Sequence, residues 1–354
     1  MSSRGFSVGE ILGGKYRLCQ LVGEGGMGSV WLGRHLLLDR ACAVKLLGAG
    51  AGPLTAKRER FVREAKIAAS VRHANVVDLF DFGETEGGEF FMVMEWLEGE
   101  SLAERLARPP LMGMRELVSI LSDVLSGLAA VHERGIVHRD LKPENIFLAR
   151  EGDTIIPKLL DFGISRSSGW AGDAGLTAAG NTVGTPHYMS REQVRGVRDL
   201  DGRADLYSVG VILYRAACGR FPFDDDELTG LLMRVAEGEA PRLQPLHLDI
   251  GDGLVQVIDR ALCSDRAGRF ASALEMRRVL WAAAGSIPAG LPAVWGLPGS
   301  GLPFDSPGGA PAGSWGNTAT DGSSTSVGMA HWRRLVPVGI ALAVVGAALA
   351  LTRH

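Results

Sequence analysis

The feature that most restricts the fold of this chain is the run His138-Arg139-Asp140-Leu141-Lys142-Pro143-Glu144-Asn145. It sets a carboxylate, an ammonium group and a carboxamide at short fixed offsets, and a second carboxylate follows in Asp161-Phe162-Gly163. Packing alone does not select so many polar side chains in one short segment. The arrangement predicts loops that hold Mg²⁺ and a phosphate chain while Asp140 accepts a proton from a hydroxyl group.

A glycine-rich segment lies far upstream, and Gly23-Glu24-Gly25-Gly26-Met27-Gly28-Ser29-Val30 fits the pattern G-x-G-x-x-G-x-V. Taken alone, this segment could be a dinucleotide-binding turn or a plain β-turn. Strand patterns lie on both sides of it, whereas a dinucleotide fingerprint requires a helix after the glycines. The flanks therefore favour a glycine hairpin whose backbone amides approach phosphate oxygens without Cβ clashes.

Hydrophobic periodicity predicts a small sheet with one helix in the first part of the chain. The helical pattern runs from about 56 to 71, and one of its faces carries Phe61, Glu64, Ala65 and Ala68. That face points Glu64 toward Lys45, which lies in Ala43-Val44-Lys45 on the third strand. A pair between them would hold the ammonium group against phosphates. The expected strands lie near 16–22, 29–34, 42–47, 76–82 and 90–95.

From about residue 101 the pattern becomes helical. Residues 206–218 are apolar nearly all round, as expected for a helix at the centre of a lobe, and their length and Arg215 argue against a membrane span. A 3.6-residue stripe precedes them at Leu117, Ile120, Leu121, Val124, Leu128 and Val131.

The C-terminal region has a different composition. Residues 285–332, rich in Gly, Pro, Ser and Ala, predict a flexible linker, although Trp295 and Trp315 keep a docking role open. Residues 333–354 predict a single transmembrane anchor, because an uncharged apolar stretch follows two arginines. We expect no extracytoplasmic domain after this anchor, and no apolar stretch near the N-terminus indicates a secretory signal.

Charge and cysteine content exclude two classes of function. The formal net charge of −3 gives no basic field to recruit nucleic acid. The four cysteines are far apart and lack the CxxC spacing of a zinc site, which fits a reducing compartment.

From about Tyr16 to Trp281 the chain resembles a bacterial eukaryotic-like (Hanks-type) serine/threonine protein kinase. The glycine-rich segment, the Lys45 strand, the 138–145 run and Asp161-Phe162-Gly163 occur in the order typical of that family. The resemblance implies an α+β bilobal fold, with a lead at 1–14, an N-lobe at 15–97 and a C-lobe at 98–284. It implies ATP and Mg²⁺ in the cleft and protein substrates with Ser or Thr acceptors. The catalytic residues it implies are Asp140, Lys142, Lys45 and Glu64, and the metal ligands are Asn145 and Asp161. The implied nucleotide-binding residues are Val22, Gly23, Gly25, Gly28, Val30, Ala43, Lys45, Met94, Glu95, Leu97, Asn145 and Asp161.

The same resemblance assigns roles by position. Met94 resembles the gatekeeper, 95–97 the hinge that binds adenine, and Asp205 the carboxylate that braces the catalytic loop. Lys142 and Gly184-Thr185-Pro186 resemble the serine/threonine branch rather than tyrosine kinases.

Two positions depart from the family pattern. Ser190-Arg191-Glu192 stands where the family usually has Ala-Pro-Glu, and Tyr214-Arg215 has Arg where Glu is frequent. Glu192 is still expected to pair with Arg269. Because neither change touches a phosphate or metal ligand, we expect an altered substrate preference rather than lost chemistry.

The segment from 161 to 192 is expected to regulate activity. Thr177 and Thr182 are candidate phosphosites, and a phosphate there could pair with Arg139 and order the segment. We expect phosphorylation in trans between self-associated copies, with the kinase domain on the cytoplasmic side of the cell membrane. Two alternatives stay open, namely a pseudokinase scaffold, favoured only by Arg191, and a kinase of small molecules.

Overall fold

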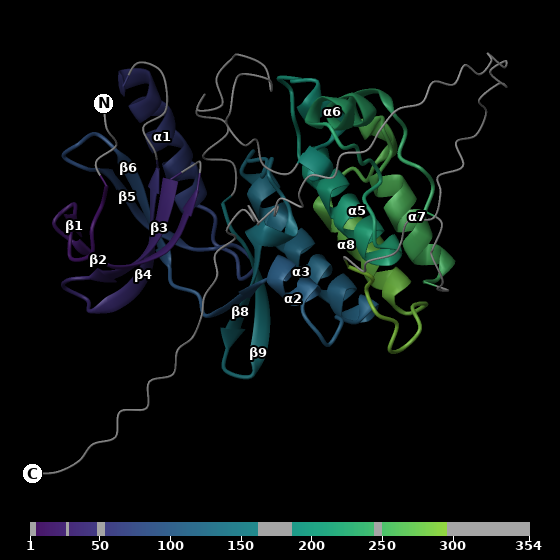
Figure 1. Cartoon of the computed structure of the whole chain (residues 1–354), viewed down its shortest axis with the longest axis horizontal. Coiled ribbons are helices and arrows are strands. Elements are labelled where there is room, and N and C mark those ends of the chain that lie inside the picture. Colours follow the sequence, from purple (N-terminus) through teal and green to yellow (C-terminus); the bar gives the residue numbers. More distant parts are fainter. Residues whose placement is uncertain (1–4, 26–27, 48–53, 162–185, 244–249, 296–354) are drawn as a thin grey trace, which may run out of the picture.

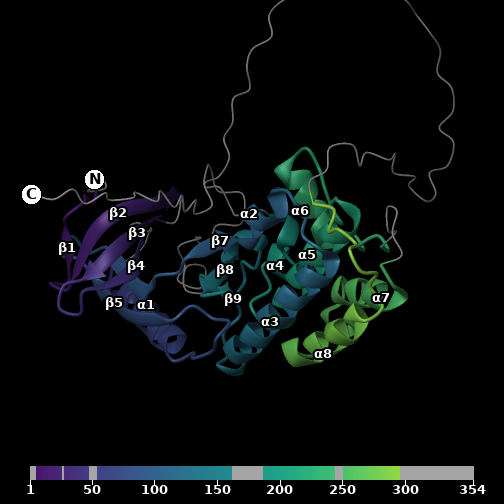
Figure 2. The same ribbon diagram turned by 90° about the horizontal axis from the view of Figure 1, so that it is seen from below.

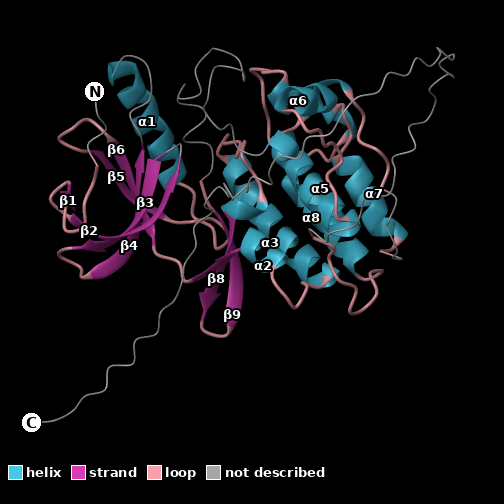
Figure 3. Ribbon diagram, in the orientation of Figure 1, coloured by secondary structure: helices cyan, strands magenta, loops and turns pink. Residues whose placement is uncertain are grey.

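The computed structural model describes residues 5–25, 28–47, 54–161, 186–243 and 250–295. These residues form two lobes, one built around a β-sheet with a single long helix and one made mostly of helices (Figure 1). Coloured by secondary structure, the strands gather in the first lobe and at its boundary with the second (Figure 3). The predicted bilobal α+β architecture is confirmed.

The N-lobe sheet is antiparallel, with the strand order β1-β2-β3-β4-β6-β5. Each predicted strand is present, and the short β1 adds one. Val44 and Val93 lie opposite each other on β4 and β6 and are fully buried, because this face of the sheet covers a small apolar core. The bounds are β1 Ile11–Leu12, β2 Tyr16–Gly25, β3 Gly28–His35, β4 Arg40–Leu47, β5 Leu79–Glu84 and β6 Phe90–Glu95.

Helix α1, Leu54–Ala69, packs on this sheet through the face that periodicity predicts. Phe61, Ala65 and Ala68 are at most 3% exposed, and the Phe61 ring stacks on Phe90 with 4.5 Å between centroids. The fourth residue of that face, Glu64, belongs to the helix, but its side chain lies outside the described part of the structure.

The C-lobe is organised around two buried helices, α3 (Met114–Glu133) and α5 (Arg203–Cys218). The predicted apolar stripe of α3 is buried along its whole length. Helix α5 is buried nearly all round and ends at Gly219, whose φ of +73° provides the left-handed cap that glycine adopts without strain. The remaining elements are β7 Gly99–Ser101, α2 Leu102–Ala107, η1 Pro143–Asn145, β8 Ile146–Glu151, β9 Thr154–Leu159, η2 Pro186–Tyr188, α4 Arg191–Val194, α6 Leu228–Glu237, α7 Asp252–Ala261, η3 Arg266–Gly268 and α8 Ala273–Ala284.

The packed region continues past the predicted start of the linker at residue 285. Ile287, Leu291 and Ala293 are buried at 0%, 8% and 2% exposure, and the structure describes the chain as far as Trp295. The expectation of a flexible linker is therefore wrong for residues 286–295. Their apolar side chains are too scattered to show a period, yet each enters the surface of the C-lobe.

The described helices include none with both the length and the apolar character needed to cross a bilayer. The predicted anchor at 333–354 and the rest of the predicted linker lie outside the described residues.

Candidate active site

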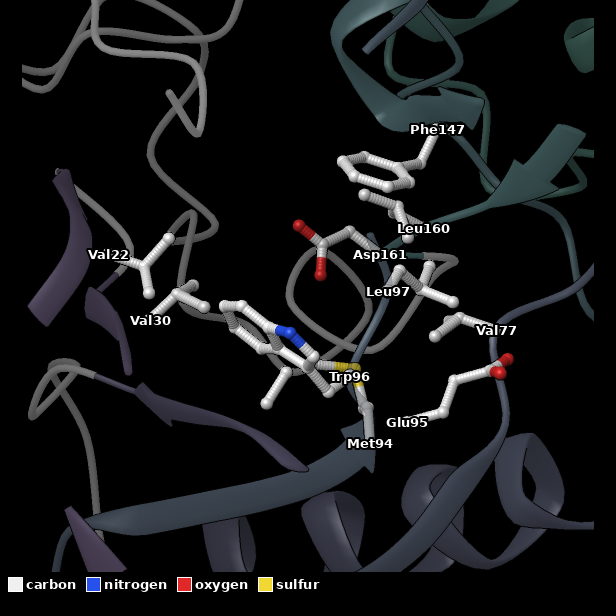
Figure 4. A pocket seen from close by; sticks show the side chains of 11 residues that line it. Val22, Val30, Val77, Met94, Glu95, Trp96, Leu97, Phe147, Leu160 and Asp161 are labelled. Carbon is white, nitrogen blue, oxygen red and sulfur yellow. The ribbon is translucent and has the colours of Figure 1, made fainter. Parts of the chain in front are cut away.

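A cavity of about 540 Å³, counted with its open mouth, lies between the two lobes. Its walls are almost entirely apolar, and one carboxylate, that of Asp161, points into it (Figure 4). A slot with apolar walls suits a flat aromatic base, since such sites bury most of a ligand and orient it through a few polar groups. The lining residues are Val22, Val30, Ala43, Val77, Met94, Glu95, Trp96, Leu97, Phe147, Leu160 and Asp161.

The rear of the cavity is the connection between the lobes, at residues 95–97. The Glu95 carboxylate points away from the cavity (Figure 4) and accepts hydrogen bonds from the Lys158 ammonium group and the Asp78 amide, both at 2.9 Å. Between the end of β6 and the start of β7, residues 96–98 belong to no strand. This stretch can therefore offer backbone groups to a base, while the Glu95 side chain fixes the connection from behind.

Replacing Lys158 with Met should loosen this connection. The Lys158 and Glu95 side chains are only 9% and 17% exposed. The change therefore leaves the Glu95 carboxylate without its cation, in a place where little solvent can reach it. We expect the free energy of unfolding to fall by about 3 kcal/mol. The KM for ATP, the nucleotide that the sequence predicts, should rise as well, because 95–97 line the cavity. Chemical denaturation and steady-state kinetics check both effects.

Two further variants make this test specific. Lys66→Met changes an exposed lysine on α1 and should alter neither quantity. Adding Glu95→Gln to Lys158→Met removes the stranded charge and should recover part of the lost stability. An unchanged stability in Lys158→Met would show that the pair has no structural role.

The glycine segment forms the hairpin that the sequence predicts. Gly25 lies opposite Gly28 at the end of the β2–β3 ladder, and residues 26–27 between them lie outside the described part. Gly28 has a φ of +129°, and a Cβ there would overlap the carbonyl of Leu46. Only glycine fits this position. The hairpin carries Val22 and Val30 on its two strands, and both line the cavity.

Lys45 and Asp161 meet inside the cleft. Lys45 lies on β4 opposite Val30 and is 8% exposed, and its Nζ lies 2.6 Å from Oδ1 of Asp161. Burial alone would raise the pKa of Asp161, but the Lys45 ammonium group, together with His138 and Lys142, holds the pKa below its usual value. The predicted Lys45–Glu64 pair stays a prediction, because the Glu64 side chain is outside the described part.

The catalytic-loop motif brings its polar groups together around Asp140. Lys142 Nζ lies 3.2 Å from Oδ2 of Asp140, and the Asn145 amide donates to the same Oδ2 at 3.2 Å and to the Asp140 carbonyl at 2.7 Å. The amide bonds orient Asn145 so that its Oδ1 is the atom left for a ligand. His138 interacts with the Leu160 carbonyl at 2.8 Å, which ties the loop to the residue before Asp161.

The backbone is strained at Arg139 and at Asp161, and the side chain of Asp205 holds the Arg139 turn in place through hydrogen bonds. Arg139 and Asp161 have φ values of +65° and +52°, which non-glycine residues rarely adopt. Asp205, 1% exposed, accepts the amides of His138 at 2.8 Å and Arg139 at 2.9 Å, and its Oδ2 lies 2.8 Å from His132 Nε2. Burial alone would raise the pKa of Asp205, but these partners keep it low. The carboxylate therefore stays charged and fixes the strained turn.

Glu192 and Arg269 form the expected pair. Nη1 and Nη2 of Arg269 donate to the two carboxylate oxygens of Glu192 at 2.7 and 3.0 Å, in a bidentate arrangement. Glu192 belongs to α4, so the pair fixes this helix to the C-lobe, although Arg191 replaces the family's proline beside it.

Sequence reasoning missed three residues of the cavity wall, namely Val77, Phe147 and Leu160. Phe147 and Leu160 are apolar residues next to the Asn145 and Asp161 motifs, so proximity to a motif was the available signal. Val77 lies far from any motif, and nothing in its neighbourhood marks it.

Several predicted residues lie outside the described part of the chain. They include Thr177 and Thr182, together with Phe162, Gly163 and Gly184-Thr185. Within the described residues, no group of three or more His, Cys, Asp or Glu side chains could hold a metal ion. A site made of Asp161 and Asn145 alone would need ligand oxygens from phosphates and water, as Mg²⁺ sites commonly do.

Comparison with known proteins agrees with this geometry. A family model described as "Protein kinase domain" matches residues 16–281. Serine/threonine-protein kinase pkn3 of Myxococcus xanthus is 41% identical over 271 residues, covering 75% of this chain and 49% of that protein. Serine/threonine-protein kinase PrkC of Bacillus subtilis is 30% identical over 269 residues, covering 76% of this chain and 40% of that protein.

Solved structures show the same fold. The crystal structure of the Mycobacterium tuberculosis PknI kinase domain aligns with a TM-score of 0.58 and 26% identity, and covers 79% of this chain and all of that one. The chain spans half or less of the length of the curated relatives pkn3, pkn2 and Pkn1.

Proposed function

Because this chain belongs to the protein kinase family, we propose that it transfers the γ-phosphoryl group of ATP to Ser and Thr hydroxyls of proteins, including its own. The observation that carries the proposal is the meeting of Lys45 with Asp161 at the inner end of an apolar cavity. The Asp140 carboxylate lies in the loop tied to that end. Similarity to curated bacterial serine/threonine kinases supports the choice of acceptor.

The residues present fit ATP and Mg²⁺. The apolar walls suit the base, and Lys45 places a cation where α- and β-phosphates would lie. Oδ1 of Asn145 and the Asp161 carboxylate are the hard oxygen donors that would hold Mg²⁺. The bound metal would neutralise charge that develops on the phosphates during transfer.

The chain's own groups divide the remaining work. Asp140 would orient the acceptor hydroxyl and accept its proton late in the reaction, because a loose transition state does not require a strong base. Lys142, beside Asp140, would stabilise negative charge on the transferring group. The cavity walls exclude water from the base-binding end, and Asp205 keeps the loop in its strained working shape.

Transfer of label from γ-labelled ATP to a generic protein substrate tests the proposal. We expect acid-stable phosphoserine and phosphothreonine in the product. Labelled inorganic phosphate with no labelled protein would instead indicate an ATPase, and ATP left intact would indicate a scaffold. Transfer to sugars or other small alcohols, with none to protein, would support the small-molecule alternative.

We further infer that the chain is tethered to the cell membrane through residues 333–354, with the catalytic domain on the cytoplasmic side. The support is sequence alone, since these residues combine an arginine pair with an uncharged apolar stretch. Tethering would raise the local concentration of copies and favour phosphorylation in trans at Thr177 and Thr182.

Fractionation of cells tests the anchor. We expect the full chain in the membrane pellet, resistant to carbonate extraction, and a chain that ends at residue 332 in the supernatant. If both versions fractionate alike, the anchor is rejected. Mass spectrometry of active full-length protein that finds 164–189 unmodified would reject phosphorylation in trans on this segment.

A further inference from the structure

Residues 286–295, here named the C-terminal strap, bind along the C-lobe through backbone contacts. The Leu291 carbonyl accepts the Met114 amide at 2.7 Å, and the Ala293 amide donates to the Met112 carbonyl at 2.8 Å. Arg115 Nε also donates to the Ile287 carbonyl at 2.6 Å. In Figure 2 the yellow-green chain leaves the α8 side of the lobe and crosses toward α5 and α6. The strap is thus built into the domain.

The end of the strap reaches helix α5 at its single basic residue after the first turn, Arg215. The Val294 amide donates to the carbonyl of Ala216 at 2.7 Å, which places Trp295 beside Arg215. The Arg215 guanidinium lies 4.1 Å from the Trp295 ring centroid and 4.2 Å from that of Phe221. We name Trp295 and Phe221 the aromatic clamp.

The clamp leaves Arg215 as a cation without a described counter-ion. Its Nη1 donates to the Tyr188 hydroxyl at 3.2 Å, and none of its nitrogens lies within salt-bridge distance of a carboxylate among the described residues. Both rings cover the guanidinium, so the N–H groups at its edge are the part that a ligand can reach. Such an edge suits a carboxylate or a phosphate, which binds two parallel N–H donors.

Arg215 lies next to Tyr188, which belongs to the part of the chain that leads from the Gly-Thr-Pro motif into α4. Tyr188 ends the η2 turn, which begins at Pro186 of the Gly-Thr-Pro motif. Burial raises the pKa of Tyr188, the nearby Arg215 charge opposes this, and the Glu144 carboxylate adds to it. Gln193, five residues after Tyr188, donates to the carbonyl of Arg139 at 2.8 Å, which ties this part of the chain to the catalytic loop.

Other charges face the same region and limit what it can select. Glu144 is exposed, and Asp224 is paired with His187 at 3.1 Å while remaining 71% exposed. His187 stacks on the clamp residue Phe221 at 4.1 Å between centroids. Arg191 adds a second cation nearby in sequence, and its buried Nε has no partner among the described groups. The Glu144 carboxylate likewise has no ion-pair partner among the described residues, so it is the charge that competes with Arg215 in this region.

We propose that Arg215, held by the aromatic clamp, selects protein substrates with an acidic side chain close to the acceptor Ser or Thr. Trp295 is a positioning residue, because it acts by holding the guanidinium. This inference rests on the protein kinase function proposed above. It explains why the strap is built into the domain: the strap completes the substrate-binding surface rather than only connecting it to later residues.

The test uses the full chain and one set of peptides. The peptides share a sequence and carry Glu, Gln or Lys at each of the three positions on either side of the acceptor. We expect at least one position where kcat/KM for the Glu peptide exceeds that for the Lys peptide by about tenfold or more. Arg215→Glu should invert that preference, and Arg215→Gln should bring the ratio close to one.

Variants of the clamp separate positioning from folding. Trp295→Ala should reduce the Glu-to-Lys ratio, while Trp295→Phe should keep most of it, because a ring still covers the guanidinium. Trp281→Ala and Arg134→Gln remove an exposed tryptophan and an exposed arginine elsewhere on the C-lobe and should leave the ratio unchanged. A purely structural role for Trp295 would lower kcat/KM for all peptides equally, which would overturn the positioning assignment.

The failure of this inference is distinct from failure of the kinase function. Equal transfer to Glu and Lys peptides by the wild-type chain overturns the selectivity of Arg215 and leaves the activity standing. Transfer to no peptide and no protein overturns both. A Lys preference that Arg215→Gln does not alter would assign selection to Glu144 or Asp224 instead.

Discussion

Asp140→Asn should reduce kcat for phosphoryl transfer by about 10²- to 10⁴-fold, the range that a positioned proton acceptor contributes. The substitution keeps the size of the side chain and can keep a hydrogen bond to Asn145, but it removes the group that accepts the hydroxyl proton. It also removes the negative partner of Lys142, which lies 3.2 Å away. Single-turnover measurement of label transfer at saturating ATP checks this value.

Binding should be affected far less than transfer in the same variant. Asp140 does not line the cavity, so the affinity for a fluorescent ATP analogue should stay close to that of the wild type. Asp153→Asn makes the same chemical change on the exposed β8–β9 turn and should leave kcat unchanged. If Asp140→Asn retained more than a tenth of wild-type activity, another group would have to be the base and the proposed mechanism would fail.

Much of the fold could be predicted because it rests on short-range patterns. The stripe on α3 and the face of α1 place Leu117 and Phe61 inside, and both are buried at 3% exposure or less. The fourth predicted strand is displaced, from 76–82 to Leu79–Glu84. The reason is tertiary, since the Val77 amide donates to the Leu159 carbonyl at the end of β9. The Leu159 amide in turn donates to the Asn75 carbonyl, which pairs Val76 with Leu159. Apolar alternation cannot show which partner such residues choose.

The candidate site shows the same division. Residues marked by motif spacing, such as Asp140, Asn145 and Asp161, could be predicted because their chemistry demands those side chains at those offsets. The Lys158–Glu95 pair could not, because the two residues are 63 positions apart and no motif links Lys158 to the hinge that contains Glu95. The C-terminal strap and the aromatic clamp around Arg215 could not be predicted from the sequence for a related reason. Isolated apolar residues in a Gly- and Pro-rich segment look unable to order themselves, and only the C-lobe surface supplies their partners.

Of the variants proposed for stability, Glu192→Gln should cause the largest loss, about 3–5 kcal/mol in the free energy of unfolding. The Arg269 side chain is fully buried and that of Glu192 is 11% exposed. Arg269 also donates to the carbonyls of Cys263, Ser264 and Arg203, so it cannot turn toward solvent when the carboxylate is lost. A guanidinium charge would stay buried without a counter-ion. The loss is a large part of the 5–15 kcal/mol typical of a folded domain.

Chemical denaturation of the wild type and the variant measures this difference. Asp39→Asn breaks the exposed Arg34–Asp39 pair and should have little effect, because solvent already screens both charges. A loss below about 1 kcal/mol in Glu192→Gln would place the buried pair in the same class as exposed ones.

The pH dependence of the same comparison identifies the carboxylate as the cause. Burial alone would raise the pKa of Glu192, but its bonds to Arg269 hold the pKa below the usual 4.5. A lowered folded-state pKa means that the stabilisation is fully present above pH 4.5 and is lost as pH falls through the folded value. The stability difference between wild type and Glu192→Gln should therefore be constant near neutral pH and shrink only below pH 4.5. A difference that persisted undiminished after the carboxylate is protonated would show that shape, and not charge, accounts for the effect.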